Sequence, residues 1–297
     1  MIAGTLVLAQ ESTTNERIIT IDGSGGTQSG NLRFGPILYQ HPDPFGISAK
    51  VSTLTILGNH VELSGPPEVS IARGGQRTAS FENGVQVIRG RLQATGPSLE
   101  YSEATGLGVL SGPANISIAP NEEGEEPVLI DADQVAFDVD TDLSTSSGNV
   151  HLVNGNQTAD ADEMIFEEGR NLGILTSAGG QATITRQDAD GSLMVITADE
   201  IRVLTDEERL YATGNVTVVD GSITSTGDVV FFDDATAIAE VIGSPARAHD
   251  ADSGATLVTD RIKQDIEFDF FEAIDSSVAS EFDAADFDLT SPAPIGE

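Results

Sequence analysis

Apolar and polar residues alternate with a period of two along much of the chain. From residue 210 to residue 218 the even positions carry Leu, Ala, Gly, Val and Val, and the odd positions carry Tyr, Thr, Asn and Thr. In a β-strand this period turns one apolar face toward a core and one polar face toward solvent. A helix needs a period of 3.6 instead. The pattern predicts a meander of short strands over residues 32–275, with little helix.

Two short motifs recur between these alternating segments. One motif is Gly followed by apolar residues at the third and fifth positions, as in residues 148–152. The other motif is a small residue, then Asp or Gly, then apolar residues at the fourth and sixth positions, and it begins at residues 132, 161, 198 and 226. The uneven spacing indicates a constant strand unit joined by loops of different lengths.

Asn or Asp followed by Gly marks four predicted turns between alternating runs. These dipeptides accept the positive φ angles of two-residue hairpin turns. They stand at Asn83-Gly84, Asn154-Gly155, Asp190-Gly191 and Asp220-Gly221. Such turns favour antiparallel hairpins over a parallel β-solenoid, which would also have more regular repeat lengths.

The two motifs together resemble those of the OstA/LptA-type proteins of lipopolysaccharide transport. The Gly-Asn-Val segments that begin at Gly148 and Gly214 carry most of the resemblance, because each follows an Ala-Asp strand at a similar distance. The resemblance is strongest within residues 92–271 and densest over residues 129–250. It implies an all-β fold, an open, twisted β-jelly-roll or slab of stacked antiparallel hairpin repeats. Familiar members are shorter, so it also implies an extended slab or two fused halves.

The resemblance implies a function as well. Such proteins bind lipid acyl chains in an apolar interior and stack end to end across the envelope. It therefore implies a non-enzymatic, exported protein of the periplasm or cell envelope. This protein would bind or bridge lipid, lipopolysaccharide-like or another acyl-chain cargo, between the inner and outer membranes. The implied partners are lipid, lipid-transport or outer-membrane proteins, and further copies of the chain joined by pairing of open edge strands.

Apolar strand faces supply the candidate lining of a lipid trough. An interior lined by aliphatic and aromatic side chains that never fully closes can take acyl chains without covalent chemistry. A packed core without lipid is the competing interpretation, because buried apolar faces are the default. The candidates are Val135, Phe137, Val150, Leu152, Met164, Phe166, Ile184, Ile201, Val203, Val216, Val218, Val229 and Phe231. Residues 229–232 are apolar on both faces, so one face is expected to meet a packed loop or a partner.

Acidic residues outnumber basic residues by a wide margin. The 297 residues include 48 Asp and Glu and 14 Lys and Arg, for a formal net charge of −34. This balance excludes a binder of nucleic acid, which needs clustered basic residues, and opposes docking on an anionic membrane surface. It also disfavours an anionic lipid headgroup unless divalent cations intervene. We interpret the charge as a solvated shell that keeps an edge-rich sheet from aggregating.

Residues for catalysis, cofactors or metals do not form recognised motifs. The chain has no cysteine, its four histidines are scattered, and it has no nucleophile elbow or phosphate-binding loop. Residues 138–142 resemble the start of a calcium-binding loop, but Leu143 replaces the required glycine. A solvated hairpin loop is the preferred interpretation there. We predict no enzyme activity, no cofactor and no metal site.

The two ends of the chain differ from its strand-rich middle. Residues 1–10 are apolar and end in a pattern typical of signal-peptide cleavage, so we interpret them as a signal-peptide remnant, with a first β-strand as the alternative. Residues 276–297 form an acidic tail that is either disordered or binds a partner through Phe282 and Phe287.

Two other functions fit an acidic all-β chain. A structural or adhesive β-solenoid of the surface or envelope, with a fully packed interior, is the main alternative to a lipid-binding slab. A glycan-handling protein is disfavoured, because sugar-binding surfaces use Trp and Tyr, and this chain has no Trp.

Overall fold

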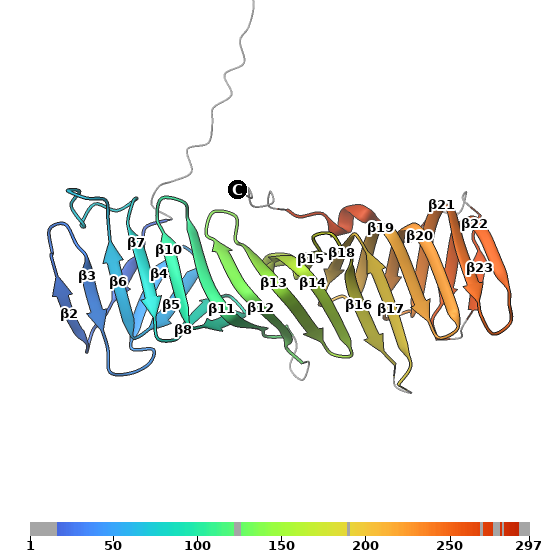
Figure 1. Cartoon of the computed structure of the whole chain (residues 1–297), viewed down its shortest axis with the longest axis horizontal. Coiled ribbons are helices and arrows are strands. Elements are labelled where there is room, and N and C mark those ends of the chain that lie inside the picture. Colours follow the sequence, from blue (N-terminus) through green and yellow to red (C-terminus); the bar gives the residue numbers. More distant parts are fainter. Residues whose placement is uncertain are drawn as a thin grey trace, which may run out of the picture.

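Antiparallel strands run across the long axis of an elongated slab (Figure 1). The computed structural model describes residues 17–121, 126–188, 191–267, 270–275, 280 and 282–290. Within them the chain forms 23 strands and two short 3-10 helices, η1 (Glu168–Arg170) and η2 (Ala284–Phe287). Every strand pairing there is antiparallel. The predicted all-β slab of stacked antiparallel strands is confirmed, and a parallel solenoid is excluded for this part of the chain.

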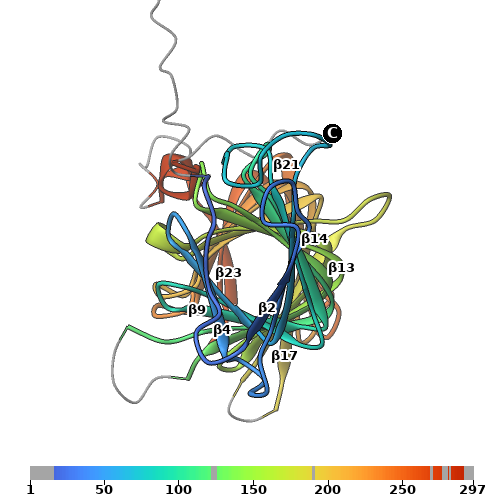
Figure 2. The ribbon, with the colours of Figure 1, turned by 90° about the vertical axis from the view of Figure 1, so that its left-hand side faces the viewer.

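The shorter strands lie in one of two facing layers, which Figure 2 shows from one end. Layer A contains β2 (Thr27–Gly30), β3 (Ile37–Gln40), β6 (His60–Ser64), β7 (Thr78–Glu82), β10 (Ser98–Ser102), β15 (Leu172–Thr176), β18 (Glu200–Leu204) and β23 (Phe270–Ala273). Layer B contains β1 (Thr20–Asp22), β4 (Ile47–Val51), β5 (Leu54–Gly58), β8 (Val85–Arg89), β9 (Leu92–Gly96), β16 (Ala182–Gln187) and β17 (Leu193–Ala198).

The longer strands run through both layers and join them. They are β11 (Leu107–Ile118), β12 (Val128–Asp138), β13 (Leu143–Asn154), β14 (Gln157–Glu167), β19 (Arg209–Asp220), β20 (Ile223–Asp233), β21 (Ile238–Asp250) and β22 (Thr256–Asp265). One half of β11 pairs with β10 in layer A, and its other half pairs with β9 in layer B. Between the two halves the pairing register of β11 and β12 shifts, between Ser111 and Ala114. The bend at this shift carries the strand from one layer into the other.

A repeated hydrogen bond holds these bends, which we call corners. Where β12 passes from layer B to layer A, Asp133 Oδ2 accepts a hydrogen bond from Asn149 Nδ2 (2.7 Å). Where the chain makes the same passage between β17 and β18, Asp199 Oδ2 accepts one from Asn215 Nδ2 (2.7 Å). In both pairs the donor follows the acceptor by 16 residues. The Ala-Asp and Gly-Asn motifs of the sequence therefore meet at the corners.

Two further corners use the same spacing with backbone donors. Asp162 Oδ2 accepts a hydrogen bond from the N–H of Ala178 (2.8 Å), again 16 residues later. Asp228 Oδ2 accepts one from the N–H of Ser244 (3.2 Å) at the same separation. A carboxylate thus satisfies backbone donors that the sheet ladder leaves unpaired at the bend.

Two of the four predicted turns are confirmed as hairpins. Asn154-Gly155 connects β13 to β14, and these two strands pair along their length. Asp220-Gly221 connects β19 to β20 in the same way. Both turns lie at the outer end of layer B, where a long strand reverses direction.

The third predicted hairpin, Asn83-Gly84, is wrong. This dipeptide connects β7 of layer A to β8 of layer B, which pair with other strands and not with each other. Both residues have positive φ angles, 67° and 96°, as a tight turn requires, but the backbone uses them to change layers. Asp190, in the fourth dipeptide, lies outside the described residues, as do residues 1–10.

We predict that Gly214→Ala weakens the fold through the corner it occupies. Gly214 has a φ of +81°, and a Cβ there would lie 2.5 Å from Asp199 Oδ2. We expect a loss of about 3 kcal/mol in the free energy of unfolding, from backbone strain plus displacement of Asp199. Gly155→Ala is the matched control, because its φ is +55° and its Cβ would meet nothing within 4 Å. We expect it to cost about 1 kcal/mol. Equal losses in urea unfolding of the two variants would contradict a close fit at the corner.

Candidate functional site

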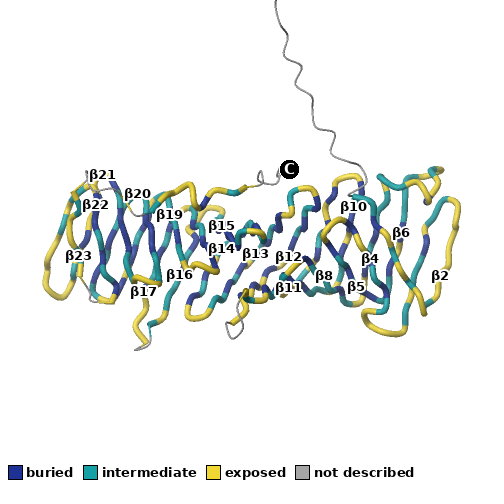
Figure 3. Tube along the Cα trace, turned by 180° about the vertical axis from the view of Figure 1, so that it is seen from behind, coloured by how far each residue is buried: buried dark blue, intermediate teal, exposed yellow. Residues whose placement is uncertain are grey.

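The inward-facing apolar side chains of both layers form one cluster along the slab. Figure 3 shows buried positions alternating with more exposed ones along the strands from one end to the other. Eleven of the thirteen predicted lining residues belong to this cluster: Val135, Phe137, Val150, Leu152, Met164, Phe166, Ile184, Ile201, Val203, Val216 and Val218. The fold brings these residues to one interior, and their contact with lipid stays a prediction.

Val229 and Phe231 do not face this interior, so their assignment to its lining is wrong. They lie in a second cluster, while Val230 and Phe232 belong to the interior. In the other copies of the motif the inward residues stand two and four positions after the corner Asp. Here that residue is Asp228, one position later than the motif alone indicates. The frame of β20 is therefore shifted by one residue, which exchanges its inward and outward faces.

The interior is filled by the side chains of the two layers. Among the inward residues, Phe137, Met164 and Val216 are at most 1% exposed, and partly buried side chains such as Tyr39 and Phe271 pack against the cluster. Protein interiors packed in this way have few voids larger than a water molecule. An acyl chain that enters the interior therefore replaces contacts between the layers, and the layers have to separate to admit it.

The hairpin ends of layer A meet those of layer B along a line that we call the seam. At its centre, Arg89 Nε at the end of β8 donates to Glu168 Oε2 in η1 (3.2 Å), and Nη1 donates to the carbonyl of Leu143 (3.4 Å). The backbone N–H of Arg91 donates to the other oxygen of Glu168 (2.8 Å). Layer B supplies the donors of these bonds, and layer A supplies the acceptors.

Further polar contacts join the two layers along the seam. On one side of the Arg89 contact, Thr53 Oγ1 of layer B donates to Asp142 Oδ1 of layer A (2.7 Å). Toward the other end, Gln157 Nε2 donates to Asp234 Oδ2 (2.8 Å), and Arg186 also pairs with Asp234. Unlike the corners, the seam is held by side chains rather than by continuous backbone.

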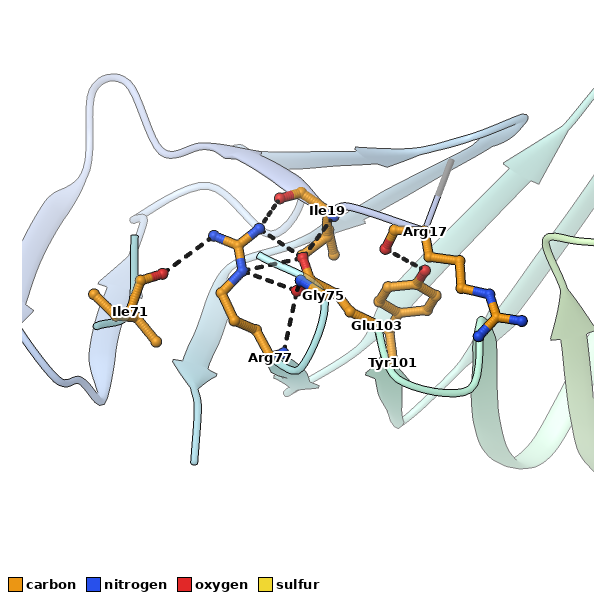
Figure 4. A network of polar contacts seen from close by, with 7 residues as sticks. All are labelled: Arg17, Ile19, Ile71, Gly75, Arg77, Tyr101 and Glu103. Atoms are coloured by element: carbon orange, nitrogen blue, oxygen red, sulfur yellow. Dashed lines mark hydrogen bonds and ion pairs between the residues drawn. The ribbon is translucent and has the colours of Figure 1, made fainter. Parts of the chain in front are cut away.

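A buried ion pair ties the first described residues to the slab (Figure 4). Glu103 follows β10 in layer A and accepts from Arg77 Nη2 (2.6 Å) and Nε (3.0 Å). It also accepts from the backbone N–H groups of Gly75 (2.7 Å) and Ile19 (3.0 Å). Because Ile19 directly precedes β1 of layer B, this carboxylate joins both layers at that end of the seam.

The partners of Glu103 control its ionisation. Burial of the carboxyl acts to raise the pKa of Glu103, but the Arg77 guanidinium and the backbone N–H donors outweigh it. The pKa is therefore lowered from its ordinary value of 4.5. The charged form is the one that the folded chain stabilises.

Two cavities open along the seam. The larger has a volume of about 590 Å³, and its lining includes Arg89 and Arg91 of layer B and Asp142 and Glu168 of layer A. The smaller, of about 270 Å³, shares Arg91 and reaches Asn154. The seam therefore combines polar side chains with open space between the two layers.

The second cluster is an outer apolar patch covered by the end of the chain. Leu172, Leu204 and Phe231 form it together with Phe287 of η2, which is fully buried. The ring of Phe282 stacks on Phe231 with centroids 5.3 Å apart. A packed segment of the chain itself thus covers the outer face of residues 229–232. Of the packed loop and the partner expected there, the structure shows the packed segment. The interpretation of a disordered tail is wrong for residues 282–290, whose aromatic side chains contact this chain itself.

Three arginines fasten this C-terminal segment. Arg202 Nη1 donates to Asp288 Oδ1 (2.8 Å), and Arg209 Nη2 donates to Asp286 Oδ2 (3.3 Å). Arg170 donates to the carbonyl groups of the same two aspartates. Acidic residues of the tail therefore neutralise basic residues on the outer face of layer A.

Neither a metal site nor a membrane-spanning helix is found in the part of the chain that the structure describes. No group of three or more His, Asp or Glu side chains there could hold a metal ion. No helix among the described residues is long and apolar enough to cross a membrane. Residues 139–142 connect β12 to β13, which pair with each other, so the hairpin interpretation of residues 138–142 is confirmed. There Asp140 pairs with Arg17, and Asp142 accepts from Thr53.

Part of the slab matches a known family. Residues 129–237 match the family model of the LptA/(LptD N-terminal domain) LPS transport protein. The matched segment begins in β12, ends after β20 and contains all four corner aspartates described above. The match supports the resemblance of this segment to the OstA-type family of lipopolysaccharide transport. No curated protein matches the chain.

We predict that the stability contributed by Glu103 is lost in acid. Glu103→Gln leaves Arg77 without its counter-charge and should cost about 3 kcal/mol in the free energy of unfolding at pH 7. Because the folded-state pKa lies below 4.5, the stabilisation is present above that value and disappears as the pH falls through the folded pKa. The difference between wild type and variant should therefore shrink below pH 4.5. Glu100→Gln, on the exposed side of β10, is the control. Urea titrations of wild type and both variants are compared at pH 7 and below pH 4.5. A difference independent of pH would contradict this origin.

We predict that Phe287→Ala releases the C-terminal segment without unfolding the slab. The substitution removes a fully buried ring from the outer patch, a change that typically costs about 3 kcal/mol or more. Amide hydrogen exchange at Asp286 and Asp288 should accelerate at least about tenfold, while exchange in the strands of layer B stays the same. Phe270→Ala, at a ring that is 54% exposed, should leave both regions unchanged. Unaltered exchange at the two aspartates would show that the ring does not hold the segment.

Proposed function

We propose that this chain is a non-enzymatic protein of the periplasm or cell envelope that binds or bridges lipid through the interior of its β-slab. The cargo is lipopolysaccharide-like or another acyl-chain lipid. The observation that carries the proposal is the match of residues 129–237 to a lipopolysaccharide-transport family. In the fold, those residues provide both walls of a continuous apolar interior. The segment that matches the lipopolysaccharide-transport family is thus also a segment that lines the apolar interior.

The physical basis of binding is the transfer of acyl chains from water. Each methylene group that enters an apolar interior contributes roughly 0.8 kcal/mol. This gain has to offset the contacts between layers that an acyl chain replaces, since the interior is packed. The seam offers the path, because side-chain contacts there can break while the strand backbone stays continuous through the corners. Lipid can thus enter from the side along the length of the slab.

The two ends of the slab suit association with further proteins. In the described ranges, β2 pairs only with β3, and β23 pairs only with β22 (Figure 1). Unpaired backbone groups on such edge strands can pair with a strand of another chain. We propose that copies of this chain, or lipid-transport and outer-membrane proteins, join at these ends to bridge the inner and outer membranes. The acidic surface does not suit nucleic acid as a partner.

A structural or adhesive scaffold of the envelope is the second candidate. The packed interior favours it, because a scaffold needs a filled core and no cargo. The two functions differ in one observable property, which is whether an acyl chain ever reaches the inward side chains.

We predict that a lipid with a photoreactive diazirine near the end of its acyl chain labels the interior. Peptides that contain inward residues such as Phe166 and Val216 should carry the label after irradiation, and mass spectrometry identifies them. Outward Leu193 and Phe270, 49% and 54% exposed, serve as internal controls for surface labelling. Excess unlabelled lipopolysaccharide should compete. Labelling confined to the outward positions, or no labelling, would reject lipid binding in the interior and favour the scaffold.

A further inference from the structure

Arg89 is a buried cation whose hydrogen bonding is incomplete. It is 3% exposed at the end of β8. Its Nε and Nη1 bond to Glu168 and to the carbonyl of Leu143, but its Nη2 has no hydrogen-bond partner among the described residues. Arg261, another buried arginine, bonds Glu240 through both Nε and Nη2 at 2.7 Å. Buried polar groups are almost always satisfied, so the open donor of Arg89 needs an explanation.

The position of Arg89 connects the interior with the seam. Its guanidinium carbon lies 5.8 Å from the ring centre of Phe137, a fully buried residue of the interior cluster. The same side chain lines the 590 Å³ cavity, a volume typical of sites for small ligands. A molecule with an apolar chain and a polar group can therefore place its chain near Phe137 and its polar group near Arg89.

The chemistry of Arg89 specifies the polar group. A guanidinium presents a planar fork of donors that matches the paired oxygens of a carboxylate or a phosphate. In this structure Glu168 supplies one oxygen to Arg89 Nε, at 3.2 Å, and its other oxygen to the backbone N–H of Arg91. An anion with more oxygens than a carboxylate can satisfy the same two donors and the open Nη2 as well.

The other acidic residues of the cavity are engaged elsewhere. Asp142 accepts from Thr53, and Glu167 accepts from the N–H of Thr290 in the C-terminal segment (3.1 Å). Glu168 is thus the carboxylate that competes for Arg89. The lining holds two arginines and three acidic residues, so it does not attract a free anion strongly. Burial of an attached apolar chain has to provide part of the binding free energy.

We propose that the phosphate group of an acyl-chain lipid binds in this cavity by displacing Glu168 from Arg89 and from the N–H of Arg91. The acyl chain then passes beside Phe137 into the interior. The exchange breaks a contact between layers, so the group that binds also opens the seam where its chain enters. This proposal rests on the proposed function and adds to it the headgroup class and the point of entry.

The test compares three probes with the full chain by isothermal titration calorimetry below their micelle concentrations. Dodecyl phosphate carries both the chain and the anion, dodecyl maltoside carries the chain alone, and inorganic phosphate carries the anion alone. We expect dodecyl phosphate to bind at least about tenfold more tightly than dodecyl maltoside, and inorganic phosphate to show no binding. Comparable affinity for inorganic phosphate would identify a free-anion site and overturn the proposal.

Two substitutions with matched controls locate the anion. Glu168→Gln removes the competitor and should raise the affinity for dodecyl phosphate about fivefold or more, with that for dodecyl maltoside unchanged. Arg89→Gln should lower the affinity for dodecyl phosphate about tenfold and abolish the preference for it. Glu100→Gln and Arg247→Gln make the same charge changes at exposed positions and should have no effect.

The outcomes separate the two proposals. Equal gains for both detergents in Glu168→Gln would mean that the seam loosens without a headgroup site, which overturns this inference and keeps the proposed function. If dodecyl maltoside binds and neither substitution changes the affinity for dodecyl phosphate, this inference is likewise overturned and the proposed function is kept. Failure of both detergents to bind rejects the proposed function, and this site with it. If Arg89→Gln does not fold, the comparison of Glu168→Gln with Glu100→Gln still decides.

Discussion

Each long strand has to serve two layers, and it can do so only where its backbone bends without leaving polar groups unpaired. The corners solve this with a carboxylate that accepts a hydrogen bond from a residue 16 positions later, as Asp133 does from Asn149. Gly148 and Gly214 supply positive φ angles beside these contacts. The same strands continue through the corners into both layers. The corners therefore set which side chains of each strand face inward and form the apolar interior.

The opposite side of the slab is held in a different way. There the layers end in hairpins, and contacts such as Arg89 with Glu168 and Gln157 with Asp234 cross between them. Continuous backbone is costly to break, whereas a side-chain contact contributes far less on its own. The seam is therefore the side along which we propose that the slab opens. Arg77, Arg89 and Arg186, three of the few basic residues of a chain with a net charge of −34, form ion pairs at the seam.

The C-terminal segment adds a second set of contacts that involves the seam. Phe287 covers an apolar patch outside layer A, which would otherwise expose Phe231 and its neighbours to water. The segment continues to Thr290, which donates to Glu167, the residue before Glu168 in the chain. A segment on the outer face and the seam therefore meet at one hairpin. The acidic charge of the tail is matched locally by arginines, so part of the net charge serves docking rather than a solvated shell.

The sequence alone determined the strands, the antiparallel slab and most of the interior, because alternation with period two is a local property that survives in the fold. It could not place Asn83-Gly84, since the same positive φ angles make a hairpin or a change of layer depending on which strands lie nearby. It misplaced the inward face of β20 because only the contact of Asp228 with Ser244 shows which residue forms the corner. The contacts of the seam could not be predicted from the sequence. Their partners lie tens of residues apart, and the bends of the tertiary structure decide which hairpins face each other.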